Sequence, residues 1–511
     1  MKRKIRTKKE GLTHQVIHNA FFQGLSGIIS KIGGFIFTII IARLLFPEIF
    51  GLYSLALSII LILITVSDLG LGQTAVRYIA ESLGKKKKKE ARSRYLFLLR
   101  FRFFIALITA VLLFFLANPL ATLFKKPGLV LPLQVGSIYL FITALYGTIR
   151  PIFLAIQKLK YSAIAEAIFQ TTRIALIFVF LYFYKTAWSV FVVLAFASFI
   201  ALLFTFLTIN KRFPFLIKGR KEKVERKRLL VFSGFLALGT LGMLIFGNID
   251  KLMLGYFLEA KFIGYYNAIL TLVSGVLGLT GFANVVFPVF TQLHGKRLKR
   301  AFKKTFYTIA IIAFPAAIGL AYIALPALQI FYGQAYVPAE YRTALLLTSV
   351  FLALLVLESL LSNVFVMLFN AKEKPKIPAF TTLAVSILNI ILNLILITSL
   401  VKIKPSYGLI GAAAATFMSR YTRFGILASL SRKKLKTSFE KSIFKPFLAT
   451  LVMLAFLFIF DYFVDLNIFT GIVMILLAAC IYFFVMFLIR GITKKDFKLV
   501  KFMFFARNRI I

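Results

Sequence analysis

The sequence predicts an all-α polytopic membrane protein of about 14 transmembrane helices. Its 511 residues are 60% hydrophobic and only 16% charged, and the mean hydropathy is +0.91. So few charged residues cannot cover a soluble surface when phenylalanine alone contributes 59 side chains. The apolar residues also fall in stretches of roughly 20, the length with which a helix crosses a bilayer. These observations exclude a soluble multidomain protein.

Each apolar stretch is expected to form one span, including the first, which is too long for the apolar region of a cleavable signal peptide. The single cysteine, Cys480, lies inside the last stretch, so an internal disulfide is impossible. The spans are expected near residues 20–42, 50–66, 95–117, 131–149, 162–184, 187–209, 230–258, 262–287, 305–325, 343–368, 378–400, 408–429, 446–464 and 468–489.

The positive charge alternates from loop to loop. The chain has 63 basic and 17 acidic residues and a net charge of +46, which in a soluble protein would indicate nucleic-acid binding. Most of the basic residues, however, lie in every second connecting segment, as the positive-inside rule requires. We therefore expect a multi-pass protein of the cytoplasmic membrane with both termini in the cytoplasm and no nucleic-acid partner. The basic segments 85–89 and 211–227 are expected to contact anionic lipid headgroups.

The sequence contains an internal repeat. Residues 45–58 match residues 258–271, with Gly51 opposite Gly264 and Tyr53 opposite Tyr266 at an offset of 213. Six spans separate the two copies, and this even number means that both copies face the same way. The repeat predicts two parallel six-helix lobes followed by an extra helix pair. The expected boundaries are 1–229 for the N-lobe, 230–429 for the C-lobe, and 430–511 for the last two spans and a basic tail.

Three groups of short motifs resemble a known family. They lie at residues 42–53 with 68–81, at residues 250–255 with 264–266, and at residues 389–393 with 407–414. Together they resemble the polysaccharide transporters, the Wzx-type flippases of the multidrug/oligosaccharidyl-lipid/polysaccharide (MOP) exporter superfamily. The resemblance runs from about residue 24 to residue 429. The chain lacks the full lipid II flippase pattern and an obvious cation-site pattern of the multidrug exporters.

The resemblance implies a MATE-like pair of lobes around a central cavity that opens alternately to each side. The implied cargo is an oligosaccharide linked to a polyprenyl phosphate or pyrophosphate, flipped to the outer leaflet for cell-surface polysaccharide synthesis. The implied partners are membrane lipids and the glycosyltransferases or polymerase of the same pathway. Coupling to a proton or sodium gradient is one possible energy source for the transport. The chain has no phosphate-binding GxxxxGK[ST] loop, so ATP hydrolysis is excluded and no cofactor is expected.

Two basic residues near the membrane midplane are candidate substrate-binding residues, because an ionisable group at that depth is costly and therefore usually functional. Lys31 shares one face of the first span with Gly24, Gly27 and Gly34, which indicates a watery cavity rather than packing alone. Arg173 shares a face of the fifth span with Gln170 and Glu166. Arg173 could bind the cargo phosphate or simply pair with Glu166, and the sequence leaves both interpretations open.

Further charges extend the candidate site. Arg420 and Glu358 are expected deep in the twelfth and tenth spans, where Glu358 is either an arginine partner or a coupling group. Asp250 and Lys251 are expected near the outer end of the seventh span, each facing a different neighbour because consecutive residues point about 100° apart on a helix. Asp68 and Arg77 could form an inner gate, although a cap or headgroup contact is the simpler interpretation. Arg100, Arg102 and Arg423 are expected to snorkel toward the membrane surface. The eleventh span carries a stripe of uncharged polar side chains, which is expected to form hydrogen bonds to other helices: Thr382, Ser386, Asn389 and Asn393.

Two other functions remain as alternatives. A small-molecule multidrug exporter would need acidic cavity residues for organic cations, whereas this chain has more basic residues at depth. A membrane glycosyltransferase or polymerase would need general acid and base carboxylates and usually a sizeable outer domain, whereas the outer loops here are short. The three histidines, His14, His18 and His294, lack metal-ligand spacing, so neither a catalytic site nor a metal site is expected.

Overall fold

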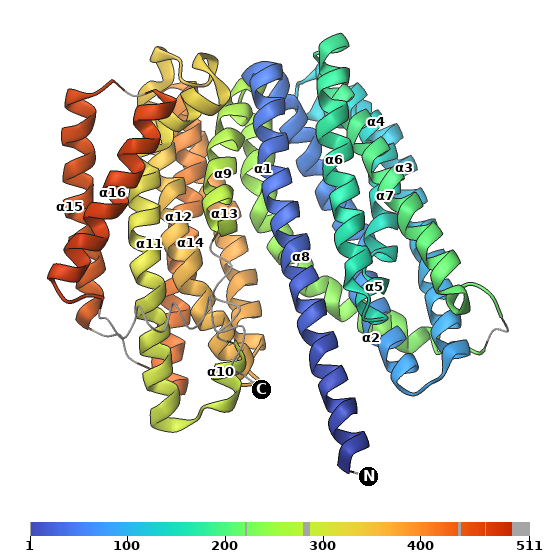
Figure 1. The fold of residues 1–511 in the computed structure, drawn as a ribbon. Coiled ribbons are helices and arrows are strands. Elements are labelled where there is room, and N and C mark those ends of the chain that lie inside the picture. The colour runs from blue at the N-terminus through green and yellow to red at the C-terminus, as the bar shows by residue number, and fades with distance from the viewer. Residues whose placement is uncertain (1, 220–221, 280–286, 438–440, 466, 493–511) are drawn as a thin grey trace. The chain divides into compact units, whose positions relative to one another are not determined.

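The computed structural model describes residues 2–219, 222–279, 287–437, 441–465 and 467–492, and all regular elements in these ranges are helical (Figure 1). The predicted all-α class is therefore confirmed. The α-helices are α1 (Lys2–Asp68), α2 (Leu71–Gly84), α3 (Lys88–Leu123), α4 (Val130–Ile149), α5 (Ile152–Ala155), α6 (Leu159–Phe183), α7 (Ala187–Arg212), α8 (Arg226–Phe257), α9 (Ala260–Leu279), α10 (Phe287–Gln292), α11 (Gly295–Tyr332), α12 (Arg342–Ala371), α13 (Lys376–Val401), α14 (Gly408–Leu435), α15 (Phe444–Phe463) and α16 (Ile468–Leu488).

The number of membrane-crossing helices differs from the expected fourteen. Within the described residues, eleven helical stretches are long and apolar enough to cross a membrane. One of the eleven contains α1, which by itself holds the first two predicted spans. The seventh and twelfth predicted spans, in α8 and α14, are not among the eleven, and α14 carries Arg420 and Arg423 in its middle. The exact count of fourteen is thus not confirmed.

Helix α1 is broken at the place where the sequence predicts a loop between the first two spans. Phe46 has φ 59° and ψ 167°, far from helical values, and Pro47 follows it. Proline lacks the N–H that would continue the helical hydrogen bonds, and it disfavours the α conformation in the preceding residue. The two predicted spans are therefore two helical segments that meet at a sharp kink.

The contacts divide the chain into two units. Unit 1 comprises Met1–Thr271 and Asn393–Ala412, and unit 2 comprises Leu272–Leu392 and Ala413–Ile511. In unit 1, α1 packs against α4 and α6, while α4 and α6 both pack against α7. In unit 2, α11 packs against α12 and the α15–α16 pair packs beside α11. The predicted lobe boundaries at residues 229 and 429 stay a prediction.

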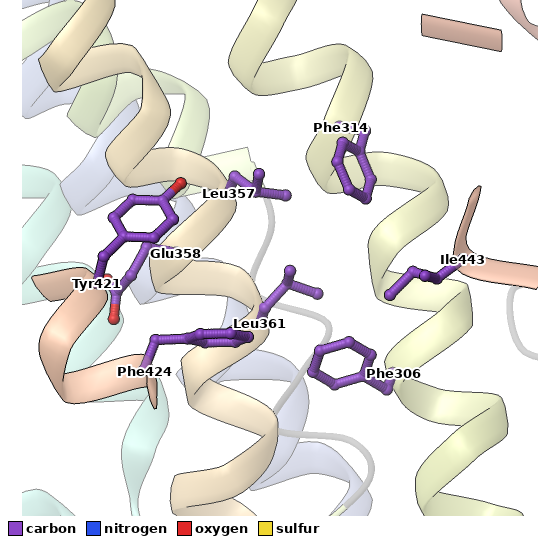
Figure 2. Close-up of a pocket in the computed structure, with 8 residues that line it drawn as sticks. All are labelled: Phe306, Phe314, Leu357, Glu358, Leu361, Tyr421, Phe424 and Ile443. Atoms are coloured by element: carbon purple, nitrogen blue, oxygen red, sulfur yellow. The ribbon is translucent and has the colours of Figure 1, made fainter. Parts of the chain in front are cut away.

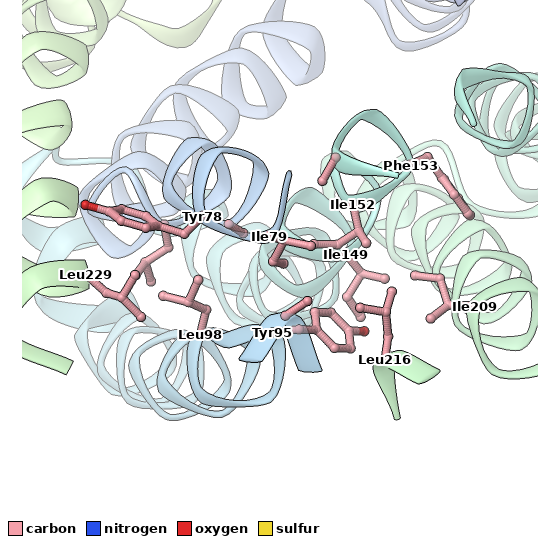
Figure 3. Packing of buried hydrophobic residues seen from close by; sticks show 14 residues of the cluster. Tyr78, Ile79, Tyr95, Leu98, Ile149, Ile152, Phe153, Ile209, Leu216 and Leu229 are labelled. Atoms are coloured by element: carbon pink, nitrogen blue, oxygen red, sulfur yellow. The ribbon is translucent and has the colours of Figure 1, made fainter. Parts of the chain in front are cut away.

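One end of unit 1 is held by a dense apolar cluster (Figure 3). Its side chains come from α2, α3, the junction of α4 and α5, and the two ends of the α7–α8 connection. Helix α2 is amphipathic, because its buried Tyr78 and Ile79 face this cluster while Arg77 is exposed. Burial of this cluster fixes the short α2 and α5 helices, which are too short to be stable alone. The labelled members are Tyr78, Ile79, Tyr95, Leu98, Ile149, Ile152, Phe153, Ile209, Leu216 and Leu229.

Within unit 1, the two copies of the internal repeat cross at their glycines. A Cβ on Gly51 would overlap the carbonyl of Ala260, and a Cβ on Gly264 would overlap the carbonyl of Pro47. The two contacts are reciprocal, since Ala260 follows Pro47 by the same 213 residues that separate the glycines. Only glycine allows helix backbones to approach this closely.

We predict that Gly51→Ala and Gly264→Ala each lower the melting temperature of the purified protein. The added methyl group forces two backbones apart, and such overpacking costs about 1–3 kcal/mol. Gly24→Ala and Gly27→Ala are matched controls, because a Cβ at either position meets nothing within 4 Å. Equal melting temperatures for all four variants would contradict the close crossing.

Candidate functional site

Helix α1 presents an exposed face of small and basic side chains. Gly24, Gly27 and Lys31 are all exposed on it, and the watery cavity expected there stays a prediction. One turn further on, a Cβ on Gly34 would lie 3.5 Å from Nη2 of Arg173 in α6. The neighbouring Gly33 also faces α6, where the close packing of Gln170 against it brings α6 onto α1. The two basic residues predicted for the cavity thus belong to neighbouring helices of unit 1.

Arg173 is held by aromatic rings rather than by a carboxylate. Its guanidinium carbon lies 4.4 Å from the ring centroid of Phe37 and 5.0 Å from that of Phe169. Such cation–π contacts are favourable where the cation is partly desolvated. Tyr53, Tyr139 and Glu166 are also near enough to interact electrostatically with it. In the part of the chain that the structure describes, however, the half-buried Arg173 side chain forms no hydrogen bond and no ion pair.

Glu166, the carboxylate predicted as a partner for Arg173, is bound by another arginine. Arg150, at the end of α4, places Nη1 2.5 Å from Glu166 Oε2, and its Nη2 donates to Ser26 Oγ at 2.8 Å. Gln170 Nε2 donates to the second carboxylate oxygen at 2.7 Å. Both oxygens of Glu166 are therefore occupied. Sequence reasoning missed Arg150, because no spacing pattern connects residues on different helices.

Asp250 has partners on two other helices, whereas the different neighbour expected for Lys251 stays a prediction. Asp250 is buried in unit 1, where it accepts hydrogen bonds from the Tyr266 hydroxyl at 2.7 Å and from Asn393 Nδ2 at 2.8 Å. These donors come from α9 and α13, so Asp250 connects three helices. Lys251 is half-buried. The polar stripe predicted for the eleventh span lies on α13, and its predicted hydrogen bonding between helices is confirmed at Asn393. In unit 2 it is also confirmed at Asn389, whose Nδ2 lies 3.2 Å from Thr416 Oγ1.

Asp68 and Arg77 do not form a pair. Asp68 lies 4.0 Å from Arg102, and Arg77 instead stacks on Phe232 with 4.3 Å between guanidinium carbon and ring centroid. Arg102 was expected to snorkel, but its side chain is buried at 1% exposure. Its guanidinium donates to Ser67 Oγ at 3.1 Å and to two backbone carbonyls, so it joins α3 to the end of α1. The expectation for Arg102 was wrong because these acceptors come from other helices.

Unit 2 contains a second ionic cluster, centred on the buried Glu358 of α12, and Figure 2 shows Glu358 with the pocket that it borders. Arg423 Nη2 donates to Glu358 Oε1 at 2.9 Å, and Arg420 Nη1 lies 3.7 Å from Oε2. Arg423 was expected to snorkel, but it is the closer partner and the less exposed of the two arginines. Glu358 also borders a cavity of about 330 Å³ that is otherwise lined by apolar and aromatic side chains: Phe306, Phe314, Leu357, Leu361, Tyr421, Phe424 and Ile443.

The fold is shared with solved membrane transporters. The lipid II flippase MurJ in an inward closed conformation superposes with a TM-score of 0.73 at 18% identity, covering 92% of this chain and 98% of that one. A multidrug resistance MATE family transporter of the MOP superfamily, in an inward-facing conformation, matches with a TM-score of 0.53 at 14% identity, covering 81% and 96%. These likenesses show that the chain shares the fold of these two transporters.

The sequence comparisons name the family. The chain belongs to the polysaccharide biosynthesis protein family, whose sequence pattern matches residues 16–294. The predicted resemblance to this Wzx-type flippase family of the MOP superfamily is therefore confirmed. The chain is also 24% identical over 392 residues to the uncharacterized membrane protein MJ1068 of Methanocaldococcus jannaschii, covering 72% of this chain and 74% of that protein.

We predict that Arg150 and Arg173 respond differently to removal of their charge. Arg150→Ala leaves the buried Glu166 without its cation and should lower stability by about 3 kcal/mol. Arg173→Ala removes a cation that has no anionic partner, so stability should change by less than about 1 kcal/mol. Thermal unfolding of the two purified variants measures the difference. A larger loss for Arg173→Ala than for Arg150→Ala would show that Arg173 is the structural ion.

Proposed function

We propose that the protein is a flippase that moves an oligosaccharide linked to a polyprenyl phosphate or pyrophosphate across the cytoplasmic membrane. The oligosaccharide would serve cell-surface polysaccharide synthesis, and the protein would act by alternating access as a secondary transporter. In this proposal the two six-helix lobes enclose the cargo path, and Lys31 and Arg173 bind the phosphate oxygens. Membership of the polysaccharide biosynthesis protein family and the MOP fold support the proposal.

The environment of Arg173 is the observation that carries the proposal. A guanidinium at membrane depth is costly unless an anion compensates it. The nearest candidate, Glu166, has both oxygens bound by other side chains, and the rings of Phe37 and Phe169 orient the guanidinium without neutralising it. Lys31 on the adjacent face of α1 adds a second positive charge. A phosphate or pyrophosphate group, which guanidinium binds with two parallel hydrogen bonds, fits this environment.

The same contacts disfavour an organic cation as cargo. Such a cargo needs a carboxylate that is free to receive it, and three candidate carboxylates of the structure already have partners. Glu166 and Glu358 pair with arginines, and Asp250 accepts hydrogen bonds from Tyr266 and Asn393. The multidrug exporter alternative therefore has less support than the flippase.

A transport assay tests the proposal. The purified protein is reconstituted into liposomes that contain a polyprenyl-pyrophosphate oligosaccharide with a fluorophore on the sugar, and an impermeant quencher reports the leaflet. Arg173→Ala should slow flipping at least about tenfold, the value of one charge-assisted hydrogen bond, and Arg173→Lys should retain part of the rate. Lys185→Ala, which removes an exposed charge between α6 and α7, is the control. An unchanged rate in Arg173→Ala would refute the phosphate role.

The glycine crossing provides a test of alternating access. Ser54 Oγ and Asn267 Nδ2 are 2.9 Å apart in this structure, and these residues are equivalent positions of the repeat. If the segments around Gly51 and Gly264 must separate during transport, a covalent link between positions 54 and 267 should stop it. We predict that Ser54→Cys/Asn267→Cys, in a Cys480→Ser background, loses flipping when oxidised and regains it on reduction. Full activity of the oxidised protein would show that this crossing does not open.

A further inference from the structure

A hollow of about 700 Å³ lies on unit 1, away from Lys31 and Arg173 in the sequence and on other helices. One wall is formed by α3, through Phe97, Arg100 and Phe104. The other wall is the chain that leads into α8, through Lys223 and Arg226. The two walls are joined by a hydrogen bond from the Glu222 backbone N–H to Ser93 Oγ at 2.7 Å. The hollow is therefore a built feature of the fold.

Three cations whose side chains have no anionic partner among the described residues border this hollow. Arg100, Lys223 and Arg226 are all exposed, and within the described residues none of their side chains forms a hydrogen bond or ion pair. The nearby Glu225 is bound by Arg228 at 3.0 Å, which leaves Glu222 as the acidic residue in the lining. The guanidinium carbon of Arg226 lies 5.6 Å from the Phe97 ring centroid, which directs this cation toward α3. The hollow thus offers net positive charge to an anion.

The hollow also adjoins the surface of α3 on which apolar side chains are exposed. No large apolar side chain of α3 is exposed before Phe103, whereas from there on the exposed ones follow at helical spacing, among them Phe104, Leu107, Ile108, Val111 and Phe115. Apolar side chains exposed along a membrane helix face lipid tails. Arg100, one turn before Phe104, therefore marks the height at which lipid tails give way to headgroups.

We propose that the hollow between α3 and the segment 222–226 is a binding site for an anionic membrane phospholipid. Arg100, Lys223 and Arg226 bind the phosphate group, and Phe104 with the apolar face of α3 contacts the acyl chains. Charge complementarity selects an anionic lipid over a zwitterionic one, since each basic residue near the surface contributes about 1 kcal/mol of attraction. The bound lipid would link α3 to the α7–α8 connection.

Quenching by brominated lipids tests this site. The full-length protein carries Phe104→Trp as the reporter and Trp188→Phe to remove its single native tryptophan. It is reconstituted in bilayers of phosphatidylcholine with increasing brominated phosphatidylglycerol, or with brominated phosphatidylcholine alone. We expect phosphatidylglycerol to bind beside the reporter at least about threefold more tightly than phosphatidylcholine. Equal quenching by the two lipids would overturn the proposal.

Two triple variants separate a local site from general electrostatics. Arg100→Gln/Lys223→Gln/Arg226→Gln should abolish the preference for phosphatidylglycerol. The control Lys296→Gln/Arg297→Gln/Arg300→Gln removes the same residue types from exposed positions of α11 and should preserve it. Loss of the preference in both variants would overturn the local site. A competition experiment compares a polyprenyl monophosphate with unlabelled phosphatidylglycerol as displacers of the brominated lipid. If the polyprenyl monophosphate displaces it at a tenfold lower mole fraction, the site belongs to the cargo and the proposal is overturned.

Discussion

The backbone crossing of α1 and α9 is the constraint on which the candidate site depends. Gly51 and Gly264 each admit the carbonyl of the opposite helix, so the two segments touch without side chains between them. A tyrosine follows each glycine by two residues, and the crossing fixes the direction of each tyrosine side chain. Tyr266 reaches Asp250 with a 2.7 Å hydrogen bond, and Tyr53 lies close enough to Arg173 to interact electrostatically. The crossing therefore positions a polar group at the candidate cation and at the buried anion.

Ionic pairing among the helices explains why the cation remains available. Burying a carboxylate within a membrane helix requires a partner, and for three carboxylates of the structure this partner is an arginine. Asp68 lies beside Arg102, Glu166 beside Arg150, and Glu358 beside Arg423 and Arg420. Because basic residues far outnumber acidic ones, some arginines have no carboxylate to pair with. Arg173 is such a residue, and its aromatic surroundings keep the guanidinium ordered while leaving its hydrogen-bond donors for a ligand.

The sequence predicted the fold class, because it depends on hydropathy and helical spacing along a single segment. The break near Pro47 was predictable for the same reason. The partners of the charges were not, since Arg102 finds Ser67 and Arg423 finds Glu358 only after the helices pack. One local signal was available but missed: Phe169 precedes Arg173 by four residues, the spacing at which side chains meet on a helix. Hydropathy also separated α1 into two spans, and its backbone kinks between them at Phe46.

The two copies of the repeat share a backbone pattern but not their charges. The 213-residue offset that relates Gly51 to Gly264 also relates Phe37 to Asp250. In the first copy, Phe37 supports the cation of Arg173 from α6 and contributes no charge. In the second copy, the equivalent position is an anion, and Tyr266 and Asn393 satisfy it with neutral donors. An added phosphate would be attracted by the first arrangement and repelled by the second. The two equivalent positions of the repeat thus differ in charge, and of these two only the first favours an anion.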